Sequence, residues 1–188
     1  MSQSEIAAPL ELPCGVVLRN RICKSAMTEA LADRHDLPTQ AHQTLYQRWS
    51  EGGMALQVTG NVMVDKRYLE RPGNVVAEDA SSLRILGLFG KPREMTADDI
   101  DDAISRYAKT AEVAKEAGFD GVQIHSAHGY LISQFLSLIT NQRRDDWGGS
   151  LENRARFLRR VYGATSASVV TDFPVTVKLN SSDFLKGG

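Results

Sequence analysis

The chain has 188 residues, of which 42% are hydrophobic and 24% are charged, and its formal net charge is −1. A chain of this length can bury roughly 70% of its unfolded surface, so the composition predicts a globular protein with a core of its own. Acidic and basic residues are interspersed, which argues against nucleic acid as a partner and favours a small-molecule ligand.

The sequence shows no targeting or membrane signal. The opening residues MSQSEIAAPLELP hold no basic cluster followed by an apolar stretch, and no segment approaches the roughly 18 continuous apolar residues of a membrane span. We therefore expect a cytoplasmic location and no membrane partner. Cys14 and Cys23 match no metal-binding or CxxC spacing, and we interpret both as reduced thiols.

Strand-like and helix-like segments alternate along the chain, a pattern typical of a parallel sheet covered by helices. The first half predicts a hairpin over residues 10–22, a strand over 21–27, a helix over 39–51 and a strand over 54–59. Residues 60–95 would then form a connection far longer than the roughly 15 residues beyond which structureless loops become uncommon.

The second half has clearer helix signals. Thr96 and Asp99 have the spacing of an N-cap and its partner, and apolar residues follow at helical spacing up to Gly118. A strand over residues 121–124 comes next. Ser150 is the expected cap of a helix that runs to about residue 168, and residues 173–179 are the last predicted strand.

The segment HSAHGYLISQFLSLITNQRRDDWGGSLENRARF, residues 125–157, begins with two histidines and a tyrosine directly after a predicted strand. Side chains at the carboxyl ends of parallel strands point into the mouth of a barrel, where the N–H donors of His125 and His128 can bind one ligand oxygen. If that oxygen belongs to an α,β-unsaturated carbonyl, each such donor stabilises the enolate formed on hydride arrival by about 3–4 kcal/mol. A tyrosine hydroxyl has an ordinary pKa of about 10, so Tyr130 can deliver a proton to the α-carbon. Because no side chain supplies hydride, the chemistry requires a redox cofactor.

Other interpretations of these residues exist. HxxH can be half of a zinc site, because imidazole is a common zinc ligand. Here the pair follows a strand, precedes Gly129 and has no adjoining glutamate, so we predict no metal. A metal-dependent hydrolase on a similar barrel also lacks enough ligands. Taken alone, Tyr130 could be an aromatic residue packing on a barrel rim.

The same segment resembles, almost residue for residue, the fourth strand and following loop of the Old Yellow Enzyme family. These proteins are NADH:flavin oxidoreductases built on a TIM barrel around FMN. The resemblance implies an ene-reductase that uses FMN, is recharged by NADH or NADPH, and reduces the C=C bond of small-molecule enones. It assigns His125 and His128 to binding the carbonyl and Tyr130 to donating the proton.

The resemblance also implies flavin contacts. Ala26, Met27 and Thr28 resemble the turn after the family's first strand, which meets the isoalloxazine ring. Gly60 matches a small residue whose backbone faces the ring, although a simple turn glycine is an equal interpretation. Lys178 matches a basic residue near the flavin N1 and O2, and its alternative is a solvated strand end.

The loop after residue 130 matches the family signature in residues that we interpret as scaffold and not as catalytic groups. They are Gln134, Asn141, Arg143, Asp145, Trp147, Gly148, Gly149, Asn153, Arg154 and Arg156. Strand alternation puts Gln123 on the same inward face as His125 and turns Ile124 toward the helices.

A complete (β/α)8 barrel typically takes about 250 residues, so the fold class implied is α/β, a partial TIM barrel in one incomplete FMN-binding domain over residues 1–188. Strands 1, 2, 4 and 5 would be present. Residues 79–88 stand where the family has its third βα unit, and the C-terminal half is missing. Two hypotheses follow: an active FMN-dependent oxidoreductase, or a truncated, inactive relative that does not retain FMN on its own. Open barrel edges also favour self-association.

Overall fold

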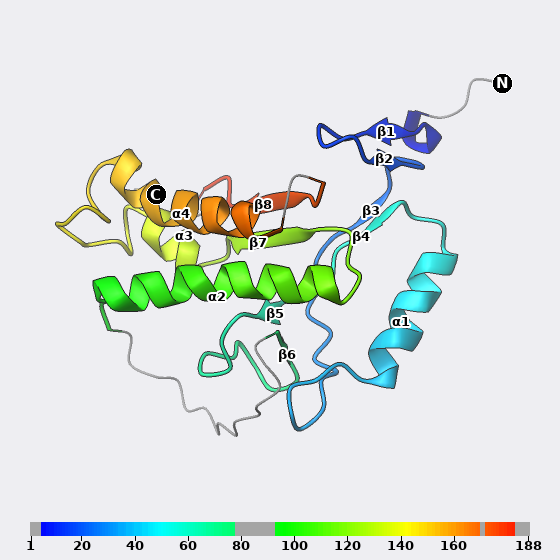
Figure 1. Ribbon diagram of the computed structural model, residues 1–188, viewed down its shortest axis with the longest axis horizontal. Coiled ribbons are helices and arrows are strands. Elements are labelled where there is room, and N and C mark those ends of the chain that lie inside the picture. Colours follow the sequence, from blue (N-terminus) through cyan, green and yellow to red (C-terminus); the bar gives the residue numbers. More distant parts are fainter. Residues whose placement is uncertain (1–4, 78–92, 170–171, 183–188) are drawn as a thin grey trace. The chain divides into compact units, whose positions relative to one another are not determined.

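A computed structural model describes residues 5–77, 93–169 and 172–182 (Figure 1). Contacts along the chain divide it into two compact units, Met1–Pro92 and Arg93–Gly188. One incomplete domain over residues 1–188 stays a prediction. None of the helices in the described ranges is long and apolar enough to cross a membrane.

The first unit is built from short strand pairs and one long helix (Figure 1). A 3-10 turn, Glu5–Ala7, precedes the predicted hairpin, whose strands pair antiparallel. The third and fourth strands pair in parallel, and the helix lies between them in the sequence, so the three elements form a βαβ unit. The elements are β1 (Leu10–Glu11), β2 (Val17–Leu18), β3 (Cys23–Lys24), α1 (Gln40–Glu51) and β4 (Leu56–Gln57).

Two predictions for this unit need correction. The strands predicted over residues 21–27 and 54–59 form only two paired residues each, β3 and β4. The sequence predicts no element over residues 60–77, but β5 (Val62–Met63) and β6 (Val75–Val76) pair in parallel there. Residues 79–88, where the third βα unit is expected to be deleted, lie outside the described residues.

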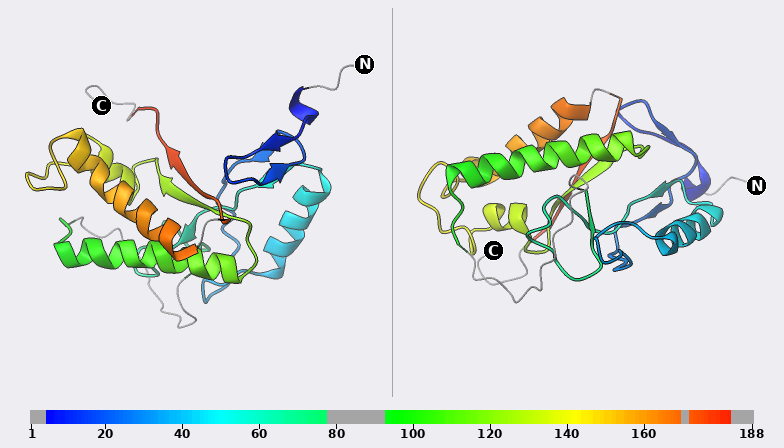
Figure 2. Two further views of the ribbon diagram at one scale, coloured as in Figure 1. Left: turned by 45° about the horizontal axis from the view of Figure 1, so that its top comes forward. Right: turned by 60° about the horizontal axis from the view of Figure 1, so that its bottom comes forward.

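The second unit is a two-stranded parallel sheet with helices packed on it (Figure 2). The strands pair in register from Val122 with Val175 to Ser126 with Leu179. The two long helices lie side by side and cover one face of this pair. The elements are α2 (Ala97–Glu116), β7 (Val122–Ser126), α3 (Leu131–Leu136), α4 (Leu151–Val169) and β8 (Val175–Leu179).

Local signals define both long helices. The Thr96 Oγ1 accepts the Asp99 backbone N–H at 3.2 Å, and the Asp99 carboxylate accepts the Thr96 N–H at 2.8 Å, so the predicted capping box is confirmed. Gly118 follows in the left-handed region, at φ +86°, where a helix usually stops. The Ser150 Oγ accepts the Asn153 N–H at 3.2 Å and caps α4 as predicted.

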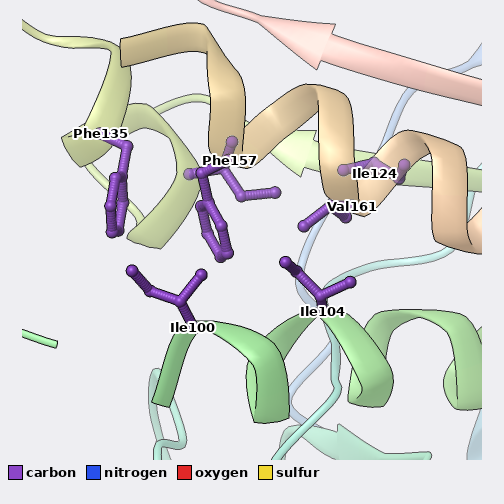
Figure 3. Packing of buried hydrophobic residues seen from close by; sticks show 7 residues of the cluster. Ile100, Ile104, Ile124, Phe135, Phe157 and Val161 are labelled. Atoms are coloured by element: carbon purple, nitrogen blue, oxygen red, sulfur yellow. The ribbon is translucent and has the colours of Figure 1, made fainter. Parts of the chain in front are cut away.

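The core of this unit lies between α2, α4 and the strand pair (Figure 3). Ile100 and Ile104 of α2 point toward Phe157 and Val161 of α4, and Ile100, Phe157 and Val161 are fully buried. The Phe157 ring lies 4.6 Å from that of Phe135 in α3, measured between centroids. The core therefore ties α3, and the loop in front of it, to the two long helices.

Candidate active site

The strand pair of the second unit presents a polar face away from its helices. Val122 and Ile124 pack against the core clusters, so alternation turns Gln123 and His125 to the opposite face. The Gln123 Nε2 donates to Thr176 Oγ1 of β8 at 3.4 Å, which puts both residues on that face. The prediction that Gln123 and His125 share a face is confirmed.

The sequence placed the end of this strand too early. The predicted strand stops at Ile124, whereas β7 continues to Ser126. His125 therefore lies within the strand, half-buried, with a backbone position fixed by its pairing with Lys178. A histidine held in a parallel ladder is more precisely placed than one in a loop.

A tight turn follows β7 and reverses the chain. Ala127 is fully buried, and His128 and Gly129 both adopt the left-handed conformation, at φ +59° and +78°. The Tyr130 backbone N–H then donates to the Ala127 carbonyl at 3.2 Å, and Tyr130 becomes the N-cap residue of α3. Residues three apart in a continuing strand point to opposite faces, so this turn is what allows His128 to approach His125.

The three predicted side chains come together at the carboxyl end of β7. The His125 and His128 rings are 5.1 Å apart between centroids, nearly perpendicular, and the Tyr130 ring is 4.9 Å from His125. His125 is thus in ring contact with both of the others. The arrangement presents two imidazoles and a phenol within reach of one small ligand.

The local backbone also sets the tautomer of His125. The Ala127 N–H donates to the His125 Nδ1 at 3.2 Å. A ring nitrogen that accepts a hydrogen bond carries no proton, so the neutral imidazole carries its proton on Nε2. The turn thereby makes Nε2 the donor of this ring.

Lys178 lies beside this group. It is directly paired with His125 across the parallel ladder and is half-buried. Because paired residues of neighbouring strands point to the same face, the ammonium group adds positive charge to the face that carries His125. The structure thus brings together four of the predicted site residues.

The signature loop is held by side chains that bind backbone carbonyls. The Asn141 Nδ2 donates to the Phe135 and Trp147 carbonyls at 2.7 and 2.8 Å. Further donors to carbonyls in this region are Gln134, Arg143, Arg154 and Arg156. Arg143 also pairs with Asp145, which lowers the pKa of that carboxyl through their hydrogen bond. These hydrogen bonds support the interpretation of the loop side chains as scaffold.

The remaining predicted residues belong to the first unit. Ala26, Met27 and Thr28 follow β3, and Gly60 follows β4, so all four lie beyond the carboxyl ends of a parallel pair. Met27 is about half exposed, and the Thr28 Oγ1 donates to a Glu70 carboxylate oxygen at 3.4 Å. Their flavin contacts stay predictions.

Gly60 has a packing role of its own. A Cβ added there would clash with the Glu29 carboxylate and the Met27 carbonyl, and the Gly60 N–H donates to Glu29 at 2.9 Å. The Tyr46 hydroxyl binds the same carboxylate. Burial, followed by this hydrogen bond, raises the pKa of Tyr46 well above its usual value. Close packing therefore explains the glycine whether or not a ligand approaches it.

The sequence missed two kinds of site residue. The supporting pair Glu29 and Tyr46 carries no local motif. Asn180, one residue past β8, accepts the His128 backbone N–H on its Oδ1 at 3.1 Å; a short polar residue just after the last predicted strand was the available signal. Over the residues the structure describes, no group of three or more His, Cys, Asp or Glu side chains could hold a metal.

Known proteins resemble this chain in both sequence and fold. A sequence profile of the NADH:flavin oxidoreductase / NADH oxidase family matches residues 70–188. The NADH-dependent flavin oxidoreductase iliE of Hypocrea jecorina is 30% identical over 97% of this chain and 61% of its own length. An NADPH dehydrogenase of Bacillus pumilus is 47% identical over 65% of this chain and 35% of its own.

The fold comparison agrees. The crystal structure of an old yellow enzyme homologue from Zymomonas mobilis has a TM-score of 0.81 at 25% identity, covering 94% of this chain and 63% of that one. Almost the whole chain aligns with the Hypocrea jecorina and Zymomonas mobilis proteins, and it spans about three fifths of the length of each. Its architecture is that of part of the family's TIM barrel. The chain belongs to the NADH:flavin oxidoreductase / NADH oxidase family, that of Old Yellow Enzyme, whose members work with FMN and with NADH or NADPH.

Proposed function

We propose that the chain carries the active site of an FMN-dependent NAD(P)H oxidoreductase of the ene-reductase type, which reduces the C=C bond of α,β-unsaturated carbonyls. The observation that carries the proposal is the meeting of His125, His128 and Tyr130 at the carboxyl end of β7. Family membership supports the reaction class. The relatives are longer than this chain, so their whole activity is transferred here as a proposal.

The donor set fits the edge of a flavin ring. Lys178 supplies positive charge on the face that carries His125, and positive charge stabilises an anionic reduced ring. In the first unit, the backbone after β3, at Ala26, Met27 and Thr28, is assigned to the ring, with Gly60 after β4. None of these residues is assigned to the FMN phosphate. When bound, FMN would supply the hydride and NADH or NADPH would restore it.

The protein groups have distinct tasks in this proposal. The Nε2–H of His125 and an N–H of His128 donate to the carbonyl oxygen of the enone, drawing electron density away from the β-carbon, which accepts hydride. The charge then lies on the enolate oxygen, where both donors hold it. The Tyr130 hydroxyl gives its proton to the α-carbon, so that the double bond ends as a saturated C–C bond.

We further propose that one βα unit of the barrel is deleted within residues 79–88. The match to the iliE oxidoreductase extends over 246 aligned residues, more than the 188 residues of this chain. The relative therefore carries residues inside the matched region that have no counterpart here. β3, β4, β7 and β8 would then be barrel strands 1, 2, 4 and 5.

The first experiment measures whether the chain retains FMN. Purified chain is titrated with FMN, and bound flavin is followed by its visible absorbance after removal of free flavin. Saturable binding supports the enzyme proposal. No bound flavin at high FMN excludes it for this chain on its own and leaves the inactive relative, the alternative that the internal deletion favours.

The second experiment measures turnover. The FMN-loaded chain is supplied with NADH or NADPH and with 2-cyclohexenone, and loss of the reduced nicotinamide is compared with formation of the saturated ketone. Replacing Tyr130 with Phe should slow ketone formation while leaving FMN bound, because only the proton donor is lost. Ketone formation at an unchanged rate would remove Tyr130 from its proposed role.

Self-association through open strand edges is a further proposal. Within the described residues, β7 and β8 pair only with each other, so each has an unpaired edge. Unpaired strand edges are templates for pairing between chains. Sedimentation velocity over a range of concentrations tests it, and a constant monomer would contradict it.

A further inference from the structure

The turn that carries His128 depends on a residue from the neighbouring strand. β7 ends at Ser126, which is paired with Leu179, so the next residues along the two parallel strands, Ala127 and Asn180, are neighbours. From this position the Asn180 Oδ1 accepts the His128 backbone N–H at 3.1 Å. It is a hydrogen bond between the two strand ends, away from the ring that would meet the ligand.

The turn needs such support because its backbone is strained. His128 has φ +59°, a region that disfavours a residue with a Cβ. Gly129 follows at φ +78°, a conformation that glycine adopts without steric cost. His128 is exposed, so packing contributes little to holding its backbone in place. Its ring nevertheless lies 5.1 Å from that of His125.

We propose that Asn180 is a positioning residue that holds the His128 turn in its left-handed form and so sets the distance between the two imidazoles. The choice of residue follows from the chemistry. A backbone N–H needs an acceptor, which an amide oxygen on a two-bond side chain provides without a charge beside Lys178. The role of Asn180 in ligand binding rests on the proposed function of the histidine pair; its hold on the turn does not.

The test uses nuclear magnetic resonance on the full chain and three variants. Asn180→Ala removes the acceptor, Asn180→Asp keeps an acceptor of the same reach, and Ser181→Ala is a control at the adjacent exposed position. Two quantities are measured: the solvent-exchange rate of the His128 amide relative to that of Gly129, and the cross-relaxation between the His125 and His128 ring protons. Cross-strand signals between β7 and β8 report whether the fold is intact.

In the unsubstituted chain the His128 amide should exchange more slowly than that of Gly129, for which the described residues provide no acceptor. Asn180→Ala should abolish the difference and weaken the signal between the rings, whereas Asn180→Asp and Ser181→Ala should keep both. Equal exchange of the two amides in the unsubstituted chain overturns the proposal, whatever the variants do. So does an unchanged ring signal in a folded Asn180→Ala variant.

Binding of phenol separates this proposal from the proposed function. With FMN present, Asn180→Ala should bind phenol roughly tenfold more weakly, the effect of losing one of two hydrogen bonds. If the unsubstituted chain binds no phenol, the proposed function fails while the exchange measurement still decides the role of Asn180. If phenol binds equally to the chain and to Asn180→Ala, the positioning role is wrong and the function stands.

Discussion

Replacing Phe157 with alanine should be the most damaging single change to the second unit. The ring is fully buried, and it contacts Phe135 at 4.6 Å and Trp147 at 6.5 Å between centroids. Removing a buried phenylalanine ring typically costs about 3–5 kcal/mol, and part of that is the cavity left behind. Lost aromatic pairs add roughly 0.5–1.5 kcal/mol each. We expect a loss of at least about 3 kcal/mol.

Urea unfolding measures this loss, followed by the fluorescence of Trp147 in a Trp49→Phe background, because Trp49 is the chain's other tryptophan. Leu151→Ala is the matched control, because Leu151 is on the same helix but 62% exposed, and surface changes are usually within about 0.5 kcal/mol. Since Phe135 is in α3, the variant should also loosen the loop that carries His128. A loss below about 1 kcal/mol, equal to that of the control, would refute the core described here.

Four further substitutions have expected outcomes. The hydrogen bond from Arg93 lowers the pKa of Asp99, so the carboxylate contributes its full stability above the ordinary carboxyl pKa and loses it as the pH falls from there toward the lowered pKa. Asp99→Asn should therefore destabilise the chain at pH 7 and progressively less at lower pH, as thermal unfolding against pH will show. A Cβ at Gly163 meets open space inside α4, so Gly163→Ala should raise the free energy of unfolding in urea by about 0.5–1 kcal/mol. Gly60→Ala should lower it, because a Cβ there meets a carboxylate. The opposite order would contradict both packing arguments. Asn141→Ala leaves two carbonyls without their donor and should cost about 1–3 kcal/mol by the same assay, and no loss would contradict the scaffold role of the loop.

Elements with local signals were predictable from the sequence. The Thr96 and Asp99 capping box and the helical spacing up to Gly118 define α2, and Ser150 defines the start of α4. The histidines and the tyrosine were found because their spacing follows a strand, and the structure brings their rings together. These three residues lie within six positions of one another, so a short stretch of sequence was enough to identify them.

Features that depend on packing between distant residues were not predictable. α3 is six residues long and its N-cap residue, Tyr130, makes no side-chain capping bond, so the burial of Ile132 and Phe135 stabilises the helix instead of a local motif. β5 and β6 are two residues each, too short for alternation to appear. The contact of Asn180 with the His128 turn depends on the register of two strands that are far apart in the sequence.

The central claim is that His125 and His128 together bind one ligand oxygen. Titration calorimetry of phenol into the FMN-saturated chain tests it, with the double variant His125→Ala/His128→Ala beside Gln123→Ala, an exposed residue on the same strand face. The account predicts that the double variant loses roughly tenfold or more in affinity and that Gln123→Ala binds as the unsubstituted chain does. Equal affinity in the double variant and the unsubstituted chain would contradict it.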